Sequence, residues 1–171
     1  MTQRVEVVDT SILVDLLDIP NEAHDHQRRI TEAEAKRKDG IQLLLPVAAV
    51  IEAGQHIQRL GEGLGRERRT CAQRLADVLD RTVRGMAPWN LTPLRWDADF
   101  LRSLLDPGLP YPLSLVESLA RRTHEMGDLT IIAEVRRLRQ NVPWATIDIW
   151  TLDAGLRAAV DSLPKTFRGP T

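Results

Sequence analysis

The stretch VEVVDTSILVDLL, residues 5–17, decides the fold. Its valines are β-branched and end at Asp9, which is typical of a short buried strand. The next residues, through Ser11, offer side chains that cap helices, and the apolar residues after them recur at helical spacing. The sequence therefore predicts a strand that ends at Asp9 and leads directly into a helix over residues 12–17.

The alternation of strand and helix continues along the chain. Further strands are predicted over 41–45 and 144–151, and residues 86–113 are predicted to be an irregular insertion with a short strand and a short helix. The other predicted helices cover residues 21–38, 47–60, 71–85, 114–126, 127–138 and 154–162. This order indicates an α/β fold in which a mostly parallel central sheet is flanked by helices on both faces, as in a three-layer sandwich.

Composition limits the class of protein. The 171 residues are 43% hydrophobic and 27% charged, with a net charge of −1, which suits one globular domain over residues 1–171. No apolar run approaches the roughly 20 residues that a membrane helix needs, and the first residues lack a signal-peptide core. Cys71 is the single cysteine, so we expect no internal disulfide and a cytoplasmic location.

Four carboxylates sit where the chain could bring them together at the carboxyl ends of the strands, which is where such a fold gathers its working residues. They are Asp9, Glu52, Asp128 and Asp153. Taken singly, the three aspartates are explained equally well as helix caps, and Glu52 by a partner arginine. Taken together, four carboxylates at one sheet edge repel one another unless a divalent cation neutralises them, and oxygen ligands select hard ions such as Mg²⁺ or Mn²⁺.

The residues around these acids resemble the motifs of PIN domains. Residues 8–17, VDTSILVDLL, are similar to the opening of that family, and residues 46–52, PVAAVIE, to its second motif. Residues 127–133, GDLTIIA, resemble the third motif, and residues 151–153, TLD, the fourth. The order and approximate spacing of the motifs span nearly the whole chain. The resemblance implies a PIN-like fold.

The resemblance also implies an activity. PIN domains are metal-dependent ribonucleases, and many are VapC-like toxins of type II toxin–antitoxin modules. On this basis Asp9, Glu52, Asp128 and Asp153 would hold Mg²⁺ or Mn²⁺ for hydrolysis of RNA to a 5′-phosphate and a 3′-hydroxyl. Partners would be the RNA substrate and a cognate antitoxin protein, with a homodimer as a further expectation. The hydroxyl side chains expected to orient the acids are Thr10, Ser11 and Thr151.

Two positions depart from the family pattern. Leu152 stands where the family usually has an arginine, and Asp148 lies within a strand where relatives are apolar. By the alternation of a strand, Asp148 faces away from Thr151 and Asp153, so we expect it to pair with an arginine instead.

Three arginine clusters are candidates for contact with RNA phosphates, although each also fits a solvated helix face. They are Arg66, Arg68 and Arg69; Arg121 and Arg122; and Arg136, Arg137 and Arg139. The third is favoured because it lies on the helix expected to carry Asp128. His56, one helical turn after Glu52, is a further candidate to assist a metal or a leaving group.

Two other functions compete with the nuclease. A catalytically inactive PIN-like module would bind RNA or a protein without cleaving. A phosphatase with an aspartyl nucleophile also has an aspartate at the end of its first strand, but it usually carries a second one two positions later, where this chain has Ser11.

Overall fold

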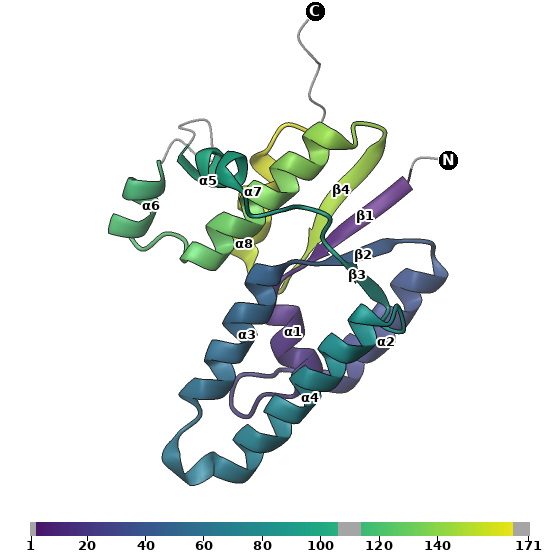
Figure 1. Cartoon of the computed structure of the whole chain (residues 1–171), viewed down its shortest axis with the longest axis vertical. Helices are drawn as coiled ribbons and strands as arrows, with labels where there is room; N and C mark the ends of the chain where they lie inside the picture. Colours follow the sequence, from purple (N-terminus) through teal and green to yellow (C-terminus); the bar gives the residue numbers. More distant parts are fainter. Residues whose placement is uncertain (1–2, 106–113, 166–171) are drawn as a thin grey trace, which may run out of the picture.

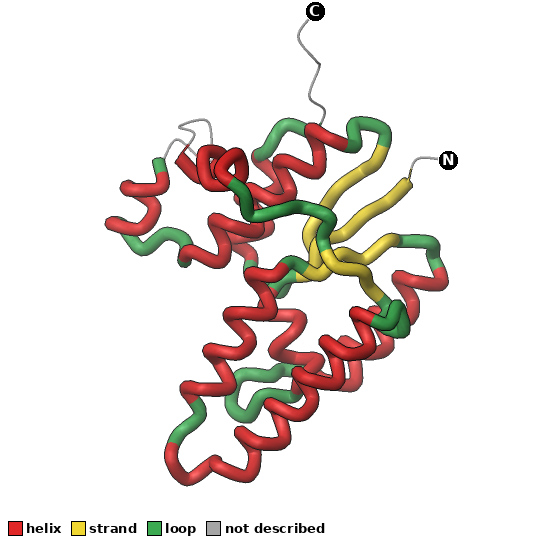
Figure 2. Tube along the Cα trace, viewed as in Figure 1, coloured by secondary structure: helices red, strands yellow, loops and turns green. Residues whose placement is uncertain are grey.

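The computed structural model describes residues 3–105 and 114–165. In these ranges the strands are β1 (Gln3–Val8), β2 (Gln42–Leu45), β3 (Trp89–Leu91) and β4 (Ala145–Trp150). They form one parallel sheet in the order β3-β2-β1-β4, and Figures 1 and 2 show helices packed around it. The predicted α/β fold with a parallel sheet between helical layers is confirmed.

One face of the sheet is covered by the helices of the first half of the chain. These are α1 (Thr10–Leu17), α2 (His26–Lys38), α3 (Val47–Arg59) and α4 (Gly65–Val83), with a 3-10 turn at Glu62–Leu64. Val8, Leu43 and Leu45 alternate to this face and pack with Ile12, Leu13 and other apolar side chains of the helices. The apolar side chains that follow the helical and strand periods in the sequence therefore pack together in one buried core.

The opposite face is covered by α7 (Met126–Asn141) and α8 (Ala154–Ser162). Val5, Val7, Ile147 and Ile149 point to this side and form a second core with these helices. Helix α5 (Ala98–Leu105) lies outside α7 and packs on it through Phe100 and Leu104, and α6 (Leu115–Ala120) follows. The predicted insertion thus contributes β3 and α5, while its residues 106–113 lie outside the described ranges.

The single helix predicted over residues 114–126 is wrong. Helix α6 ends at Ala120, and Arg122 has a positive φ of 52°, a left-handed conformation that a helix cannot continue through. A new helix, α7, begins at Met126 with a capping box between Glu125 and Asp128. Neither glycine nor proline marks this break, so sequence patterning does not reveal it.

The strand order places a functional site at one end of the sheet. β2 and β4 lie on opposite sides of β1, so the order reverses at β1, and ligands of such folds bind at the carboxyl ends of strands near that reversal. Asp9 follows β1 there, and its backbone N–H donates to the carbonyl of Trp150 at 3.0 Å. In the described residues, no helix is both long and apolar enough to cross a bilayer.

Candidate metal and nuclease site

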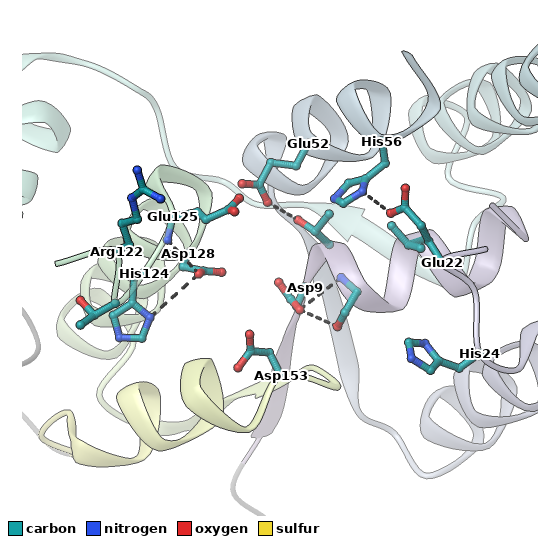
Figure 3. A pocket seen from close by; sticks show the side chains of 14 residues that line it. Asp9, Glu22, His24, Glu52, His56, Arg122, His124, Glu125, Asp128 and Asp153 are labelled. Carbon is teal, nitrogen blue, oxygen red and sulfur yellow. Dashed lines mark hydrogen bonds and ion pairs between the residues drawn. The ribbon is translucent and has the colours of Figure 1, made fainter. Parts of the chain in front are cut away.

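A cavity of about 400 Å³ opens at the carboxyl ends of β1 and β4 (Figure 3). Four acidic side chains predicted to converge line this one cavity, and we call them the four acids: Asp9, Glu52, Asp128 and Asp153. Asp9 directly follows β1, Glu52 lies in α3, Asp128 lies in α7 and Asp153 directly precedes α8, so they come from segments far apart in the sequence. The fold therefore brings together the carboxylates that the sequence analysis singled out.

Asp9 lies deepest among the four, with 3% of its surface exposed. Its Oδ2 accepts hydrogen bonds from Ser11 Oγ at 2.6 Å and from Thr151 Oγ1 at 2.7 Å, and a longer one from the Ser11 backbone N–H. The last of these makes Asp9 the N-cap of α1, so the same side chain both caps a helix and lines the pocket. Because all these bonds end on Oδ2, Oδ1 takes part in none of them.

Leu152 contributes to the same network through its backbone. Its N–H donates to Ser11 Oγ at 3.0 Å, while Ser11 Oγ donates to Asp9. The side chain that departs from the family pattern is exposed, so the departure does not disturb the contacts of Asp9.

Glu52 lies in the second turn of α3, half-buried at the edge of the pocket. Thr10 Oγ1 donates to Glu52 Oε2 at 2.6 Å, so the charge has a hydroxyl partner rather than the arginine that was the alternative. Proline at position 46 is the N-cap of α3, directly after β2, and this brings the helix start to the carboxyl end of the sheet.

Asp128 is expected to begin its helix, but it is the third residue of α7, which starts at Met126. Its Oδ2 accepts the Glu125 backbone N–H at 3.1 Å, which closes the capping box. Burial raises the pKa of Asp128 to about 6, and the negative charges of the other three acids add to this rise, against the lowering effect of the bond from Glu125. Asp128 therefore lies close enough to the other three carboxylates to be repelled by their charge.

Asp153 is exposed and is the N-cap of α8, where its Oδ1 accepts the Leu156 N–H at 2.9 Å. Its own N–H donates to Thr151 Oγ1, so the Thr151 hydroxyl joins Asp153 to Asp9. Asp148 is not among the residues that line the cavity, as expected, but its Oδ1 accepts the Ile149 N–H and no ion pair with an arginine is found in the described ranges.

The charge of the four acids is not balanced by basic side chains. Across residues 3–105 and 114–165, no ion pair joins a lysine or arginine to any of them, and the single basic contact is His124 Nδ1 at 3.9 Å from Asp128 Oδ2. Their oxygens are the donors that Mg²⁺ and Mn²⁺ prefer, so the residue types fit such an ion. No three His, Cys, Asp or Glu side chains of the described residues are, however, already gathered around one point as a metal site requires.

The pocket extends beyond the four acids to His56 and Arg122, which the sequence analysis named as candidates, and to further residues that it did not name. Glu22 forms an ion pair with Nδ1 of His56, and the exposed His24 also lines the pocket (Figure 3). On the α7 side, Arg122 and Glu125 line the wall. No spacing signal marks Glu22, and the His24-x-His26 spacing has no further metal ligands nearby in the sequence. Glu22 and His24 lie on the connection between α1 and α2 and reach the pocket only through the tertiary fold.

The favoured arginine cluster does not line the pocket. Arg139 is 4% exposed and donates to the backbone carbonyls of Ile147, Val160 and Leu163, so the prediction that it contacts RNA is wrong. Arg136 and Arg137 are half-buried, and Arg137 lies over the Phe100 ring with Nη1 at 3.6 Å from Asp97 Oδ1.

Comparison of the chain with protein-family models, with curated proteins and with solved structures finds no match. A function therefore has to be argued from the pocket itself.

Proposed function

We propose that this chain is a Mg²⁺- or Mn²⁺-dependent endoribonuclease and the toxin component of a type II toxin–antitoxin module. One observation carries the nuclease proposal: four carboxylates from four separate segments line one cavity, and among the residues that the structure describes no lysine or arginine is paired to them. Buried or clustered charges are retained in proteins when a counter-charge stabilises them, and here the counter-charge would come from outside the chain.

Asp9, Glu52, Asp128 and Asp153 would hold the ion, which supplies an activated water and stabilises the charge that develops on the attacked phosphate. The chain's own task is to hold these oxygens in place. The hydroxyls of Ser11 and Thr151 fix Asp9, and the hydroxyl of Thr10 fixes Glu52.

A covalent mechanism has little support in this pocket. The Ser11 hydroxyl donates to Asp9 and accepts the Leu152 N–H, so it is engaged in orienting the acid. The second aspartate of an aspartyl phosphatase is absent at this same position. Hydrolysis by water, directed by the four acids, is therefore the reaction we propose.

Arg122 is the residue we propose for contact with an RNA phosphate, in place of the third cluster. It is exposed and is one of the residues that line the cavity, so it adds an arginine to surroundings that are otherwise rich in carboxylates. The toxin role, the cytoplasmic location and the antitoxin partner rest on the resemblance to PIN domains. An antitoxin would place a basic or apolar segment into this acidic pocket.

One observation favours a second candidate, a PIN-like module that binds RNA or a protein without cleaving. In the described residues no three ligand side chains are gathered closely enough to hold a metal. Under the nuclease proposal, the exposed Asp153 turns toward Asp9 and Asp128 when an ion binds.

Cleavage of RNA with Mg²⁺, with Mn²⁺ and with EDTA tests the nuclease proposal, using wild type and Asp9→Asn. We expect cleavage with either ion, none with EDTA, and none from the variant, whose fold is retained because the side-chain volume barely changes. Cleavage that survives both EDTA and the substitution would reject the mechanism. Folded wild type that binds RNA but neither binds Mn²⁺ nor cleaves would establish the second candidate.

Expression in bacteria tests the toxin role separately. Wild type should arrest growth, Asp9→Asn should not, and a small neighbouring gene for a DNA-binding protein should restore growth when co-expressed. Normal growth with an active wild-type nuclease would remove the toxin assignment and leave the ribonuclease.

A further inference from the structure

Gly127 is the described glycine at which a side chain would collide with another group. A Cβ built on its backbone would overlap the carboxylate of Glu52, at Oε1, Cδ and Oε2. These three atoms belong to the carboxylate of a pocket acid, and the residue after Gly127 is Asp128.

The backbone does not explain the glycine. Gly127 lies in the first turn of α7 and does not have the positive φ that favours glycine, as Gly40 and Gly85 do. Alanine is a better helix former than glycine at such a position. A residue that local structure disfavours is therefore present where its missing side chain leaves room for Glu52.

The Glu52 carboxylate is confined from two sides. Thr10 Oγ1, in the first turn of α1, donates to Oε2, and the Gly127 backbone lies against the same carboxylate from α7. The acid thus reaches from α3 across the pocket toward the N-terminal turn that carries Asp128, as Figure 3 shows.

We propose that Gly127 is a positioning residue: its lack of a side chain lets the Glu52 carboxylate lie against α7, beside Asp128, where the two acids share one pocket. The positioning role rests on the proposed function only in assuming that the acids hold a metal ion. The overlap itself involves the far end of a flexible side chain, so a larger residue at position 127 moves Glu52 and leaves the fold intact.

The variant Gly127→Ala tests this role through Mn²⁺ affinity, measured by calorimetry, and through RNA cleavage. We expect Mn²⁺ binding about 10- to 100-fold weaker than in wild type, the range typical for loss of a group that orients a metal ligand. The thermal midpoint in EDTA should not fall. The matched control is Gly54→Ala, also within a helix, where a Cβ would meet nothing within 4 Å. It should leave the Mn²⁺ affinity and the rate of RNA cleavage unchanged.

A double-mutant cycle separates positioning from a general effect on the pocket. Glu52→Asp withdraws the carboxylate by about one methylene, away from the space that a Cβ would fill. Gly127→Ala should therefore weaken Mn²⁺ binding in the Glu52 background and have no further effect in the Glu52→Asp background. Equal effects in both backgrounds, or affinity in Gly127→Ala equal to or above that of wild type, would overturn the inference.

The proposed function and this inference fail in different ways. Wild type that binds Mn²⁺ together with an unaffected Gly127→Ala refutes the positioning role alone. If wild type binds no Mn²⁺, the nuclease proposal fails, and a crystal structure of Gly127→Ala still decides the inference. A Glu52 carboxylate displaced from α7 supports it, and an unmoved one contradicts it.

Discussion

Two aspartates of the first motif, Asp9 and Asp15, lie in the same short helical unit but in opposite electrostatic surroundings. Asp15 is completely buried, and it accepts hydrogen bonds from the His24 N–H at 2.7 Å and from Arg29 Nε at 3.0 Å. Burial opposes its ionisation, but the backbone N–H of His24 and the guanidinium of Arg29 lower the pKa of Asp15 below its ordinary value.

The pocket has the reverse balance. Its acids accept hydrogen bonds from hydroxyl and backbone groups, but in the described ranges none of them forms an ion pair with a lysine or arginine. Burial and repulsion by the other three acids raise the pKa of Asp128 to about 6. The chain therefore supplies a counter-charge where an acid serves structure. At the pocket, we propose, the counter-charge comes from a bound ion, and this difference between the two regions is what the following predictions test.

The largest effect is expected from a substitution that removes the charge of one pocket acid. Asp128→Asn should lower the rate of RNA cleavage about 10³-fold, because a metal ion contributes several kcal/mol to transition-state stabilisation. The asparagine can still accept the Glu125 N–H, so α7 remains capped. Single-turnover cleavage with Mn²⁺ measures this, with the exposed Asp77→Asn on α4 as the equal change of charge outside the pocket. Similar rates for both variants would remove Asp128 from the site.

The second prediction concerns the internally paired acid. Asp15→Asn breaks the buried ion pair with Arg29 and leaves that guanidinium, among the described residues, only the half-buried Glu32 as a charged partner, which should cost about 3 kcal/mol in the free energy of unfolding. Urea denaturation in EDTA measures it, and Asp128→Asn should show no such loss under the same conditions. Equal destabilisation by the two variants would abolish the contrast between the regions.

The third prediction concerns the effect of added Mn²⁺ on stability. At about 100 times its dissociation constant, Mn²⁺ should raise the free energy of unfolding of wild type by about 2.7 kcal/mol, provided that it binds only the folded state. Asp9→Asn should lose this gain, whereas Asp77→Asn should keep it. Stabilisation of the Asp9 variant to the full extent would place the ion elsewhere.

The smallest effect is a dependence on pH. Because the folded-state pKa of Asp128 is raised, its contribution to stability is fully present below the unfolded pKa of 3.8 and is lost as the pH rises through about 6. Without metal, the free energy of unfolding of wild type should fall by about 1 kcal/mol relative to Asp128→Asn between about pH 5 and about pH 7. Parallel pH profiles for the two proteins would contradict the raised pKa.

The sequence predicts the pocket better than it predicts its surroundings. Asp9 is identified because a β-branched strand and a helix cap meet at one residue, and general rules of parallel sheets then place the site at the carboxyl ends of the strands. Glu52 is identified because a charge stands beside buried positions of α3. These signals are local, so one sequence is enough to read them.

The arginines show where local signals fail. Helix α7 packs between β4 and α5, so it is buried on two sides, and its apolar period does not show that Arg139 lies inside. Glu22 and Arg122 reach the pocket from connections whose path is set by tertiary packing, and Arg122 lies at a helix break that no glycine or proline marks. Residues on such connections cannot be placed from periodicity.

A crystal structure of wild type grown with Mn²⁺ and measured at the manganese absorption edge tests the central claim most directly. We predict an anomalous difference peak at ligand distance from carboxylate oxygens of Asp9 and Asp128, with Asp15 still bound to Arg29. A fully ordered pocket without such a peak, or with a basic side chain seated among the four acids, would contradict it.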